Sequence, residues 1–131
     1  PTWEVLATER IDEIHRRLPS AHLVMHGSSS VPQELQDEIN QYGGNIKQTW
    51  GVPVEEIQRG IAHGVRKINV DTDNRLAITG AIRKVLYTHP EKSDPRDYLT
   101  PAGEAMKQVC LAGMVAFGQA GHASALRAVL V

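Results

Sequence analysis

Only two segments of this chain have the pattern of a buried strand, and that number limits the folds open to it. They are HLVMH, residues 22–26, and VRKINVD, residues 65–71. Helical patterns surround them in the order helix, strand, helix, helix, strand, helix, which is typical of a parallel α/β fold. Parallel strands are buried on both faces and normally occur in larger sheets. We therefore expect the 131 residues to form part of a larger α/β unit.

Apolar spacing and chain breakers predict where the helices lie. The first helix is expected over residues 9–18, with Thr8 as its cap. The segment SDPRDYL, residues 93–99, is expected to form a turn or a short helix, and order is expected to be lost after Gly118. The other expected helices run from about Ser30 to Tyr42, from Pro53 to Gly64, from about Asp73 to Tyr87, and from Thr100 to about Phe117.

Composition excludes several classes of protein. The 14 Lys and Arg residues are balanced by 15 Asp and Glu residues, so no basic surface suggests a nucleic-acid partner. No apolar run approaches the roughly 20 residues of a membrane span, and the N-terminal sequence lacks the pattern of a signal peptide. The single cysteine, Cys110, excludes an intrachain disulfide framework. We expect a cytoplasmic protein.

Both predicted strands end in polar residues that suit a ligand. The first ends at His26 and continues into Gly27 and three serines, where backbone N–H groups and the following helix can hold an anion. Near the end of the second strand, Asn69 and Asp71 lie on the same face. In open α/β sheets and barrels, ligands bind at the carboxyl ends of strands. The pattern predicts a phosphorylated ligand beside a metal.

Simpler roles remain open for each of these residues. A histidine at a strand end is often only hydrogen-bonded, and a serine-rich helix start is often only a cap. Asp71, Thr72 and Asp73 could equally cap the next helix. The other five histidines have no paired metal spacing, and Cys110 lies on an apolar helix face, where an unreactive thiol is expected.

Three stretches resemble the C-terminal part of class II, metal-dependent fructose-bisphosphate aldolases. They are HLVMHGSSSVP, GVPVEEIQRGIAHGVRKINVDTDNRLAITGAIR and SDPRDYLTPAGEAMKQVCLAGMVAFGQAG, which occur in this order over nearly the whole chain. The resemblance implies a (β/α)8 TIM barrel, of which residues 1–131 would be a partial domain. They would contain strands 7 and 8 with flanking and C-terminal helices.

The resemblance also implies roles for individual residues. His26 would bind the catalytic zinc, and Arg96 would reach across a subunit interface to the second phosphate of the substrate. Residues 93–99 have no apolar periodicity, so nothing local is expected to hold the Arg96 guanidinium. The remaining substrate and phosphate contacts would come from Gly27, Ser28 and Ser29 after the first strand, and from Asn69, Val70, Asp71 and Thr72 after the second.

The activity implied by the resemblance is reversible cleavage of fructose 1,6-bisphosphate to dihydroxyacetone phosphate and glyceraldehyde 3-phosphate. This reaction serves glycolysis, gluconeogenesis and the Calvin cycle. The family resemblance implies zinc, which a second divalent or a monovalent cation can accompany, and a homodimer or homotetramer. The proton donor and the other zinc ligands are expected on earlier strands, so no catalytic residue is expected in this chain. Alternatives are an aldolase for sedoheptulose or tagatose bisphosphate, or a non-catalytic segment that serves assembly.

Overall fold

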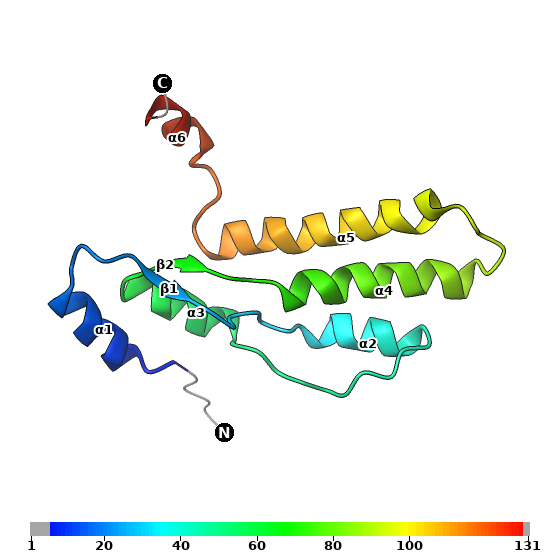
Figure 1. The fold of residues 1–131 in the computed structure, drawn as a ribbon, viewed down its shortest axis with the longest axis horizontal. Coiled ribbons are helices and arrows are strands. Elements are labelled where there is room, and N and C mark those ends of the chain that lie inside the picture. Colours follow the sequence, from blue (N-terminus) through cyan, green and yellow to red (C-terminus); the bar gives the residue numbers. More distant parts are fainter. Residues whose placement is uncertain (1–5, 130–131) are drawn as a thin grey trace.

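The computed structural model describes residues 6–129, which form six helices and a parallel sheet of two strands (Figure 1). Residues 1–5 and 130–131 of the expected domain lie outside the described residues. The order of elements agrees with an α/β unit. In chain order they are α1 (Thr8–Arg17), β1 (Leu23–Met25), α2 (Gln33–Gln41), α3 (Val54–Ala62), β2 (Val65–Ile68), α4 (Thr72–Thr88), α5 (Pro95–Ala116) and α6 (Ala123–Val129).

The two strands lie side by side and point the same way, with Leu23 opposite Val65 and Met25 opposite Ile68. Both are shorter than predicted. One more backbone bond, from Asn69 N to Met25 O (3.1 Å), follows the strands before the two chains enter their loops. Val24 in β1 is 44% exposed. A parallel sheet is normally covered on both faces, whereas here Val65 is buried and Val24 is not, so one part of the pair is left uncovered by the described residues.

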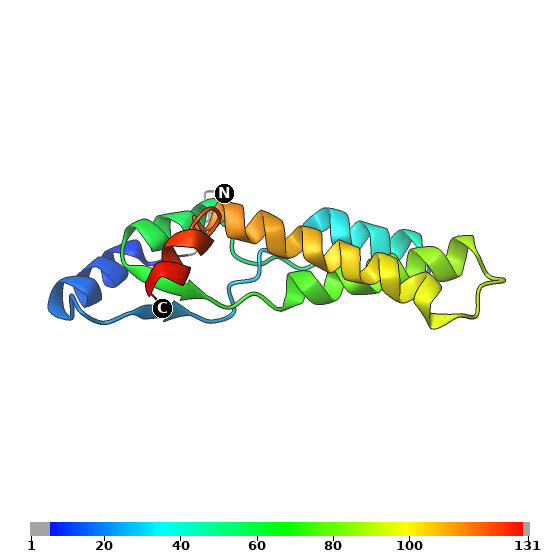
Figure 2. The same ribbon diagram turned by 90° about the horizontal axis from the view of Figure 1, so that it is seen from above.

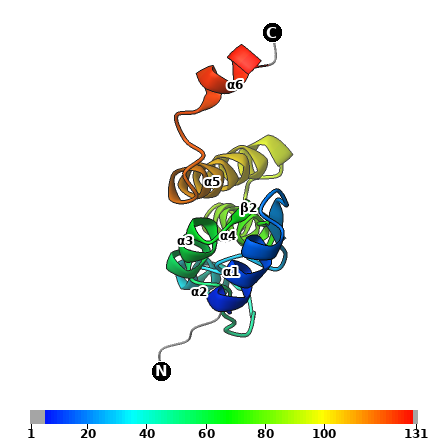
Figure 3. The ribbon, with the colours of Figure 1, turned by 90° about the vertical axis from the view of Figure 1, so that its left-hand side faces the viewer.

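Three helices form a stack that extends beyond the carboxyl ends of the two strands, with α5 along α4 and α4 along α2 (Figures 2 and 3). Small residues allow this close approach, since Ala77 and Ala81 of α4 and Ala102 of α5 are buried. The largest buried side chains are Ile39 of α2 and Ile57 of α3. Burying an isoleucine contributes about 1.5–3 kcal/mol. These side chains attach α2 and α3 beneath the loops that leave the strands.

Helix α5 begins earlier than the sequence analysis predicted. Residues 93–99 are not a separate turn, because Asp94 is the N-cap of one helix that runs from Pro95 to Ala116. The Asp94 side chain accepts a hydrogen bond from Arg96 N (2.9 Å), and Pro95 occupies the first helical position, which suits proline. Pro101, which was expected to start the helix, lies inside it.

Two smaller expectations were also wrong. Ala7, not Thr8, is the N-cap residue of α1, and no side chain caps that end. The chain after Gly118 does not lose order throughout, because the alanine-rich segment Ala123–Val129 forms α6. Within residues 6–129, no helix combines the length and apolarity needed to cross a membrane.

Candidate functional site

The carboxyl ends of β1 and β2 lie next to one another, so the polar residues that follow the two strands come together. His26 Nδ1 lies 2.9 Å from Asn69 Nδ2, although the two residues are 43 positions apart. The Lys67 ammonium contacts the Asn69 side-chain oxygen. His26 itself is exposed. The parallel pairing of the strands therefore places an accessible imidazole and an amide at one edge of the sheet.

The hydroxyl of Ser29 caps helix α4 from a distant part of the chain. Ser29 Oγ accepts hydrogen bonds from Asp71 N (3.1 Å) and Thr72 N (3.0 Å). No side-chain hydrogen bond from the N-cap residue Asp71 itself closes this end. The first N–H groups of a helix need acceptors from outside it, and Ser29 supplies one. The Ser29 hydroxyl is thus occupied within the fold, and the N–H of Thr72 is occupied with it.

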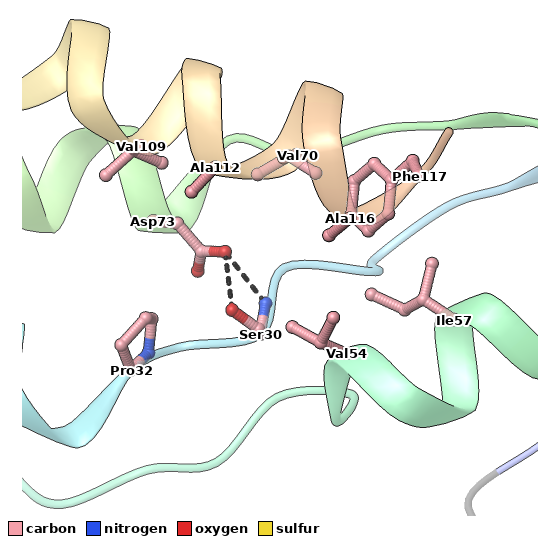
Figure 4. A pocket seen from close by; sticks show the side chains of 11 residues that line it. Ser30, Pro32, Val54, Ile57, Val70, Asp73, Val109, Ala112, Ala116 and Phe117 are labelled. Carbon is pink, nitrogen blue, oxygen red and sulfur yellow. Dashed lines mark hydrogen bonds between the residues drawn. The ribbon is translucent and has the colours of Figure 1, made fainter. Parts of the chain in front are cut away.

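The carboxylate of Asp73 holds the same loop from the other side. Asp73 Oδ2 accepts from Ser30 N (2.9 Å) and Ser30 Oγ (3.0 Å), and Oδ1 accepts from Val31 N (2.7 Å). The two bonds from Ser30 are drawn in Figure 4. Asp73 is only 5% exposed. A buried carboxylate is costly unless its oxygens are hydrogen-bonded, and here both oxygens are.

The backbone of the loop is unusual at both ends. Gly27 has φ +63° and Val31 has φ +53°. A positive φ is strained for a β-branched residue, and the bond from Val31 N to Asp73 helps to hold it. Within the described residues, the N–H groups of Gly27, Ser28 and Ser29 meet no acceptor, whereas those of Ser30 and Val31 do. These three N–H groups have no partner within the described fold, and they differ in exposure, since Gly27 is exposed whereas Ser28 and Ser29 are buried.

The segment just before α3, which contains Gly51 and Val52, packs against this loop. Val52 N donates to Ser29 O (3.0 Å). A Cβ added at Gly51 would lie 1.9 Å from Ser29 O and 2.8 Å from Val31 Cγ2. Only a residue without a side chain can pass the loop this closely. Ser28, which is fully buried, donates from Oγ to His26 O (3.3 Å).

A cavity of about 230 Å³ lies beneath the loop, between α3, α4 and the C-terminal end of α5 (Figure 4). Among the described residues that line it, Asp73 alone is charged, and Asp73 is already paired with Ser30. Val70, one of the expected substrate residues, lines this cavity with its apolar side chain. The cavity therefore offers no free charged group to a phosphate.

Asp71 lies at the exposed edge of the site. Its carboxylate forms an ion pair with Arg75 one turn along α4 (2.7 Å), and both side chains are about 70% exposed or more. It does not cap the helix with its side chain. The capping alternative raised for Asp71 is therefore not the arrangement in the structure.

Arg96 lies far from the strand ends. Helix α4 starts at the site and has 17 residues, which corresponds to about 25 Å, and Arg96 follows at the far end of the α4–α5 hairpin (Figure 1). Contrary to expectation, a local partner holds its guanidinium: Arg96 Nε lies 2.9 Å from Asp94 Oδ2. The Arg96 side chain is still 87% exposed.

The contact changes the titration of the Asp94 cap. Hydrogen bonds from the Arg96 guanidinium and then from Arg96 N lower the pKa of the Asp94 carboxyl below its usual value. A lowered pKa in the folded state means that the contribution of the group is present above its unfolded pKa. That contribution is lost as the pH falls through the folded pKa. The cap of α5 is therefore formed at neutral pH.

The described residues offer an incomplete set of ligands for a metal. A catalytic zinc takes about three protein ligands and leaves one position open. Among residues 6–129, no group of three His, Cys, Asp or Glu side chains could hold a metal ion. His26 is an accessible imidazole whose Nδ1 accepts from the Asn69 amide nitrogen, whereas a metal-bound histidine donates its second ring N–H to an acceptor. Within residues 6–129 the candidate ligand is His26, and a complete metal site would need further ligands from outside these residues.

Three residues of this arrangement were missed or misassigned from the sequence. Asp73 was considered only as a cap, and the contacts of Ser30 and Gly51 were not predicted. A signal for Asp73 was present: it is spaced by four and eight residues from Ala77 and Ala81, so it lies on the buried face of α4. A carboxylate on such a face requires partners. No comparable signal marks Gly51, whose role depends on where a distant loop passes.

Comparison with known proteins identifies the family of this chain. The family described as "Fructose-bisphosphate aldolase class-II" matches residues 1–122. The chain is 60% identical over 129 residues to "Fructose-bisphosphate aldolase" of Nostoc sp., and 58% identical over 129 residues to the protein of that name from Xanthobacter flavus. Each alignment covers 98% of this chain and 36% of the relative.

A Synechocystis sp. protein named "Fructose-bisphosphate aldolase class 2" is 60% identical over 127 residues, which are 97% of this chain and 35% of that protein. The chain thus spans about a third of the length of the curated relatives that it matches. The family match covers all the residues of the site described above. This chain belongs to the class II fructose-bisphosphate aldolase family.

Proposed function

We propose that this chain is the C-terminal part of a (β/α)8 barrel, in which β1 and β2 are strands 7 and 8. The complete protein would cleave fructose 1,6-bisphosphate reversibly to dihydroxyacetone phosphate and glyceraldehyde 3-phosphate. The observation that carries the proposal is the meeting of His26 and Asn69 at two parallel strand ends, next to the free N–H groups of residues 27–29. We further propose a cytoplasmic homodimer or homotetramer that takes part in central sugar metabolism.

In this proposal the loop binds the phosphate of dihydroxyacetone phosphate. The N–H groups of Gly27, Ser28 and Ser29 donate to phosphate oxygens, while the Ser29 hydroxyl keeps α4 in place. Fixed donors cost no reorganisation when the ligand arrives. Holding the phosphate also orients the neighbouring carbonyl group for reaction. In the same proposal Asn69 and Asp71, which follow the second strand, contact the hydroxyl groups of this ligand.

His26 is proposed as a zinc ligand, with the remaining ligands and the proton donor on earlier strands of the barrel. When bound, zinc would supply Lewis-acid polarisation of the substrate ketone. For Nε2 of His26 to bind a metal, Nδ1 must carry the ring proton, and the Asn69 amide would then turn to present its oxygen to Nδ1 in place of its nitrogen. A partner of this kind fixes the orientation of a ligating imidazole. Asn69 therefore positions His26 in addition to facing the substrate.

Arg96 is proposed to act on the second phosphate in the site of a neighbouring subunit. Its distance from the strand ends of its own chain is too large for a side chain to span, because α4 alone separates them by about 25 Å. The guanidinium is exposed and held only by Asp94. A planar, permanently charged fork suits a phosphate, and Asp94 would keep it extended from the start of α5.

Mixing two impaired variants of the complete protein tests this arrangement. Arg96→Ala should weaken use of the bisphosphate by about 1.5–3 kcal/mol, the value of a charge-assisted hydrogen bond. It should barely affect proton exchange on dihydroxyacetone phosphate alone. Hybrids of Arg96→Ala and His26→Ala subunits should regain one competent site and measurable cleavage activity. The homogeneous variants are the controls, and hybrids confirmed by native mass spectrometry that stay inactive would contradict action across the interface.

Asp71→Ala should weaken binding of dihydroxyacetone phosphate and leave the zinc content unchanged. The cost to folding should be below about 1 kcal/mol, because the Asp71–Arg75 pair is exposed. The affinity can be measured by calorimetry and the metal by mass spectrometry. Arg75→Ala is the matched control, since it breaks the same ion pair and keeps the Asp71 carboxylate. An equal loss of affinity in both variants would show that only the ion pair matters.

A further inference from the structure

We propose that Asp73 is a positioning residue that fixes the phosphate loop, residues 27–31, by acting as a built-in anion for its second half. The inference rests on the proposed function for the identity of the ligand. Asp73 is buried and hydrogen-bonded at both carboxylate oxygens. It does not itself contact the ligand in this proposal. Its effect on binding passes through the backbone of the loop.

The bonds to Asp73 divide the N–H groups of the loop into two sets. Ser30 and Val31 donate consecutive N–H groups to the carboxylate, at 2.9 and 2.7 Å. Two consecutive N–H groups that converge on an anion form a nest, so a side chain of the protein already fills this one. The N–H groups of Gly27, Ser28 and Ser29 are left without an acceptor among the described residues. An incoming phosphate therefore finds one set of donors, not two.

The strained backbone at Val31 shows what the carboxylate maintains. Valine at φ +53° is unfavourable by itself, and the neighbouring Pro32 restricts the backbone of Val31 further. Two further contacts support the same conformation: the Gln36 amide donates to Val31 O (3.2 Å), and Val31 is buried. Without the bond to Asp73, Val31 N would be a buried donor without a partner. The loop would then relax away from the shape that leaves residues 27–29 free.

The negative charge of Asp73 helps to identify its role, because Asp73 lies close to the proposed phosphate site. A carboxylate near a phosphate site repels the ligand, so a neutral residue would be favoured if Asp73 had only to fill space. Two N–H groups and one hydroxyl require more acceptor capacity than an asparagine offers, because its amide nitrogen can only donate. Asp73→Asn therefore removes the charge and one acceptor with almost no change in volume. The direction of the change in phosphate affinity then shows which effect is larger. Loss of positioning lowers the affinity, whereas loss of repulsion raises it.

The test uses the complete protein and its Asp73→Asn variant. We expect the Kd for inorganic phosphate and for dihydroxyacetone phosphate to rise about tenfold or more, as for a lost charged hydrogen bond. The zinc content should be unchanged, and hydrogen–deuterium exchange of residues 29–32 should become faster. Glu56→Gln is the matched control, because Glu56 is also a buried carboxylate but pairs with Arg59 on α3. It should leave phosphate affinity and loop exchange unaltered, even if it lowers the melting temperature.

The outcomes separate this inference from the proposed function. If the wild-type protein binds no phosphate, the proposed site is wrong and the inference fails with it. If the wild type binds phosphate and Asp73→Asn binds it equally well or better, only the inference fails. Should Asp73→Asn not fold, Ser30→Ala removes one of the three bonds, that from Ser30 Oγ (3.0 Å). It should raise the phosphate Kd about two- to fivefold, less than Asp73→Asn does because two of the three bonds remain, and an unchanged Kd would overturn the inference.

Discussion

Replacing His26 with alanine in the complete protein is expected to remove most of the bound zinc and to lower the cleavage rate by more than about a hundredfold. Even residues that only support a metal ligand cost roughly ten- to a hundredfold when they are replaced, and His26 is proposed as a ligand itself. Its imidazole is exposed at the strand end and is oriented by Asn69 at 2.9 Å. The zinc content, measured by mass spectrometry, and the initial rate of cleavage check this expectation.

His22→Ala is a matched control for this substitution. His22 is an exposed histidine just before β1 and lies outside the site. Its replacement should leave the zinc content and the rate unchanged. If His26→Ala retained full zinc occupancy, His26 would be only a hydrogen-bonding partner of Asn69. The structural role considered from the sequence would then be the correct one.

Gly51→Ala should destabilise the protein strongly and distort the phosphate loop at the same time. The new methyl group would lie 1.9 Å from Ser29 O, a backbone atom that also accepts the bond from Val52 N. Ser29 cannot move aside alone, because its hydroxyl caps α4. Overpacking of this kind costs about 1–3 kcal/mol or more, and the lost hydrogen bond adds about 1 kcal/mol. Urea unfolding of the complete protein measures the change.

Gly103→Ala is the control, because the same glycine-to-alanine change is expected there to raise the stability. Gly103 lies inside α5, and a Cβ there would meet nothing within 4 Å. Alanine in the interior of an exposed helix is favoured over glycine by about 0.5–1 kcal/mol. Gly103→Ala should therefore raise the stability slightly and leave phosphate affinity unchanged. A Gly51→Ala protein as stable as the wild type would show that the 45–53 segment is free to move away from the loop.

The sequence was sufficient for the elements whose signals are local. Pro53 and Gly64 bracket α3, and the run HLVMH contains β1. The start of α5 was misplaced because two prolines compete for the role of first residue. Pro101 was chosen, whereas the Asp94 cap makes Pro95 the correct one. The lesson is that a proline near a helix start has to be judged with the residue that precedes it.

The candidate site was predictable in its location but not in its connections. Polar residues at two strand ends indicated that His26 and Asn69 would lie near one another, because parallel strands end at the same edge. The contacts of Ser29 and Asp73 join segments about 43 residues apart. They depend on the register of the strands and the rotation of α4, which no local pattern specifies. The sequence therefore could not show that Asp73 accepts from the N–H groups of Ser30 and Val31 and leaves those of residues 27–29 for a ligand.

The two long-range links have a consequence for how the protein acquires its site. Ser29, in the loop after β1, caps α4, and Asp73, in the first turn of α4, holds that loop. The loop and the start of α4 therefore supply each other's hydrogen bonds across about 43 residues. Neither the loop nor the start of α4 has its final hydrogen bonds until β1 and β2 are paired. Closing a chain segment of this length has an entropic cost that local contacts do not offset. The anion loop is therefore assembled late in folding, and a break in the chain between α2 and α3 would leave two pieces that must find each other before either can bind phosphate.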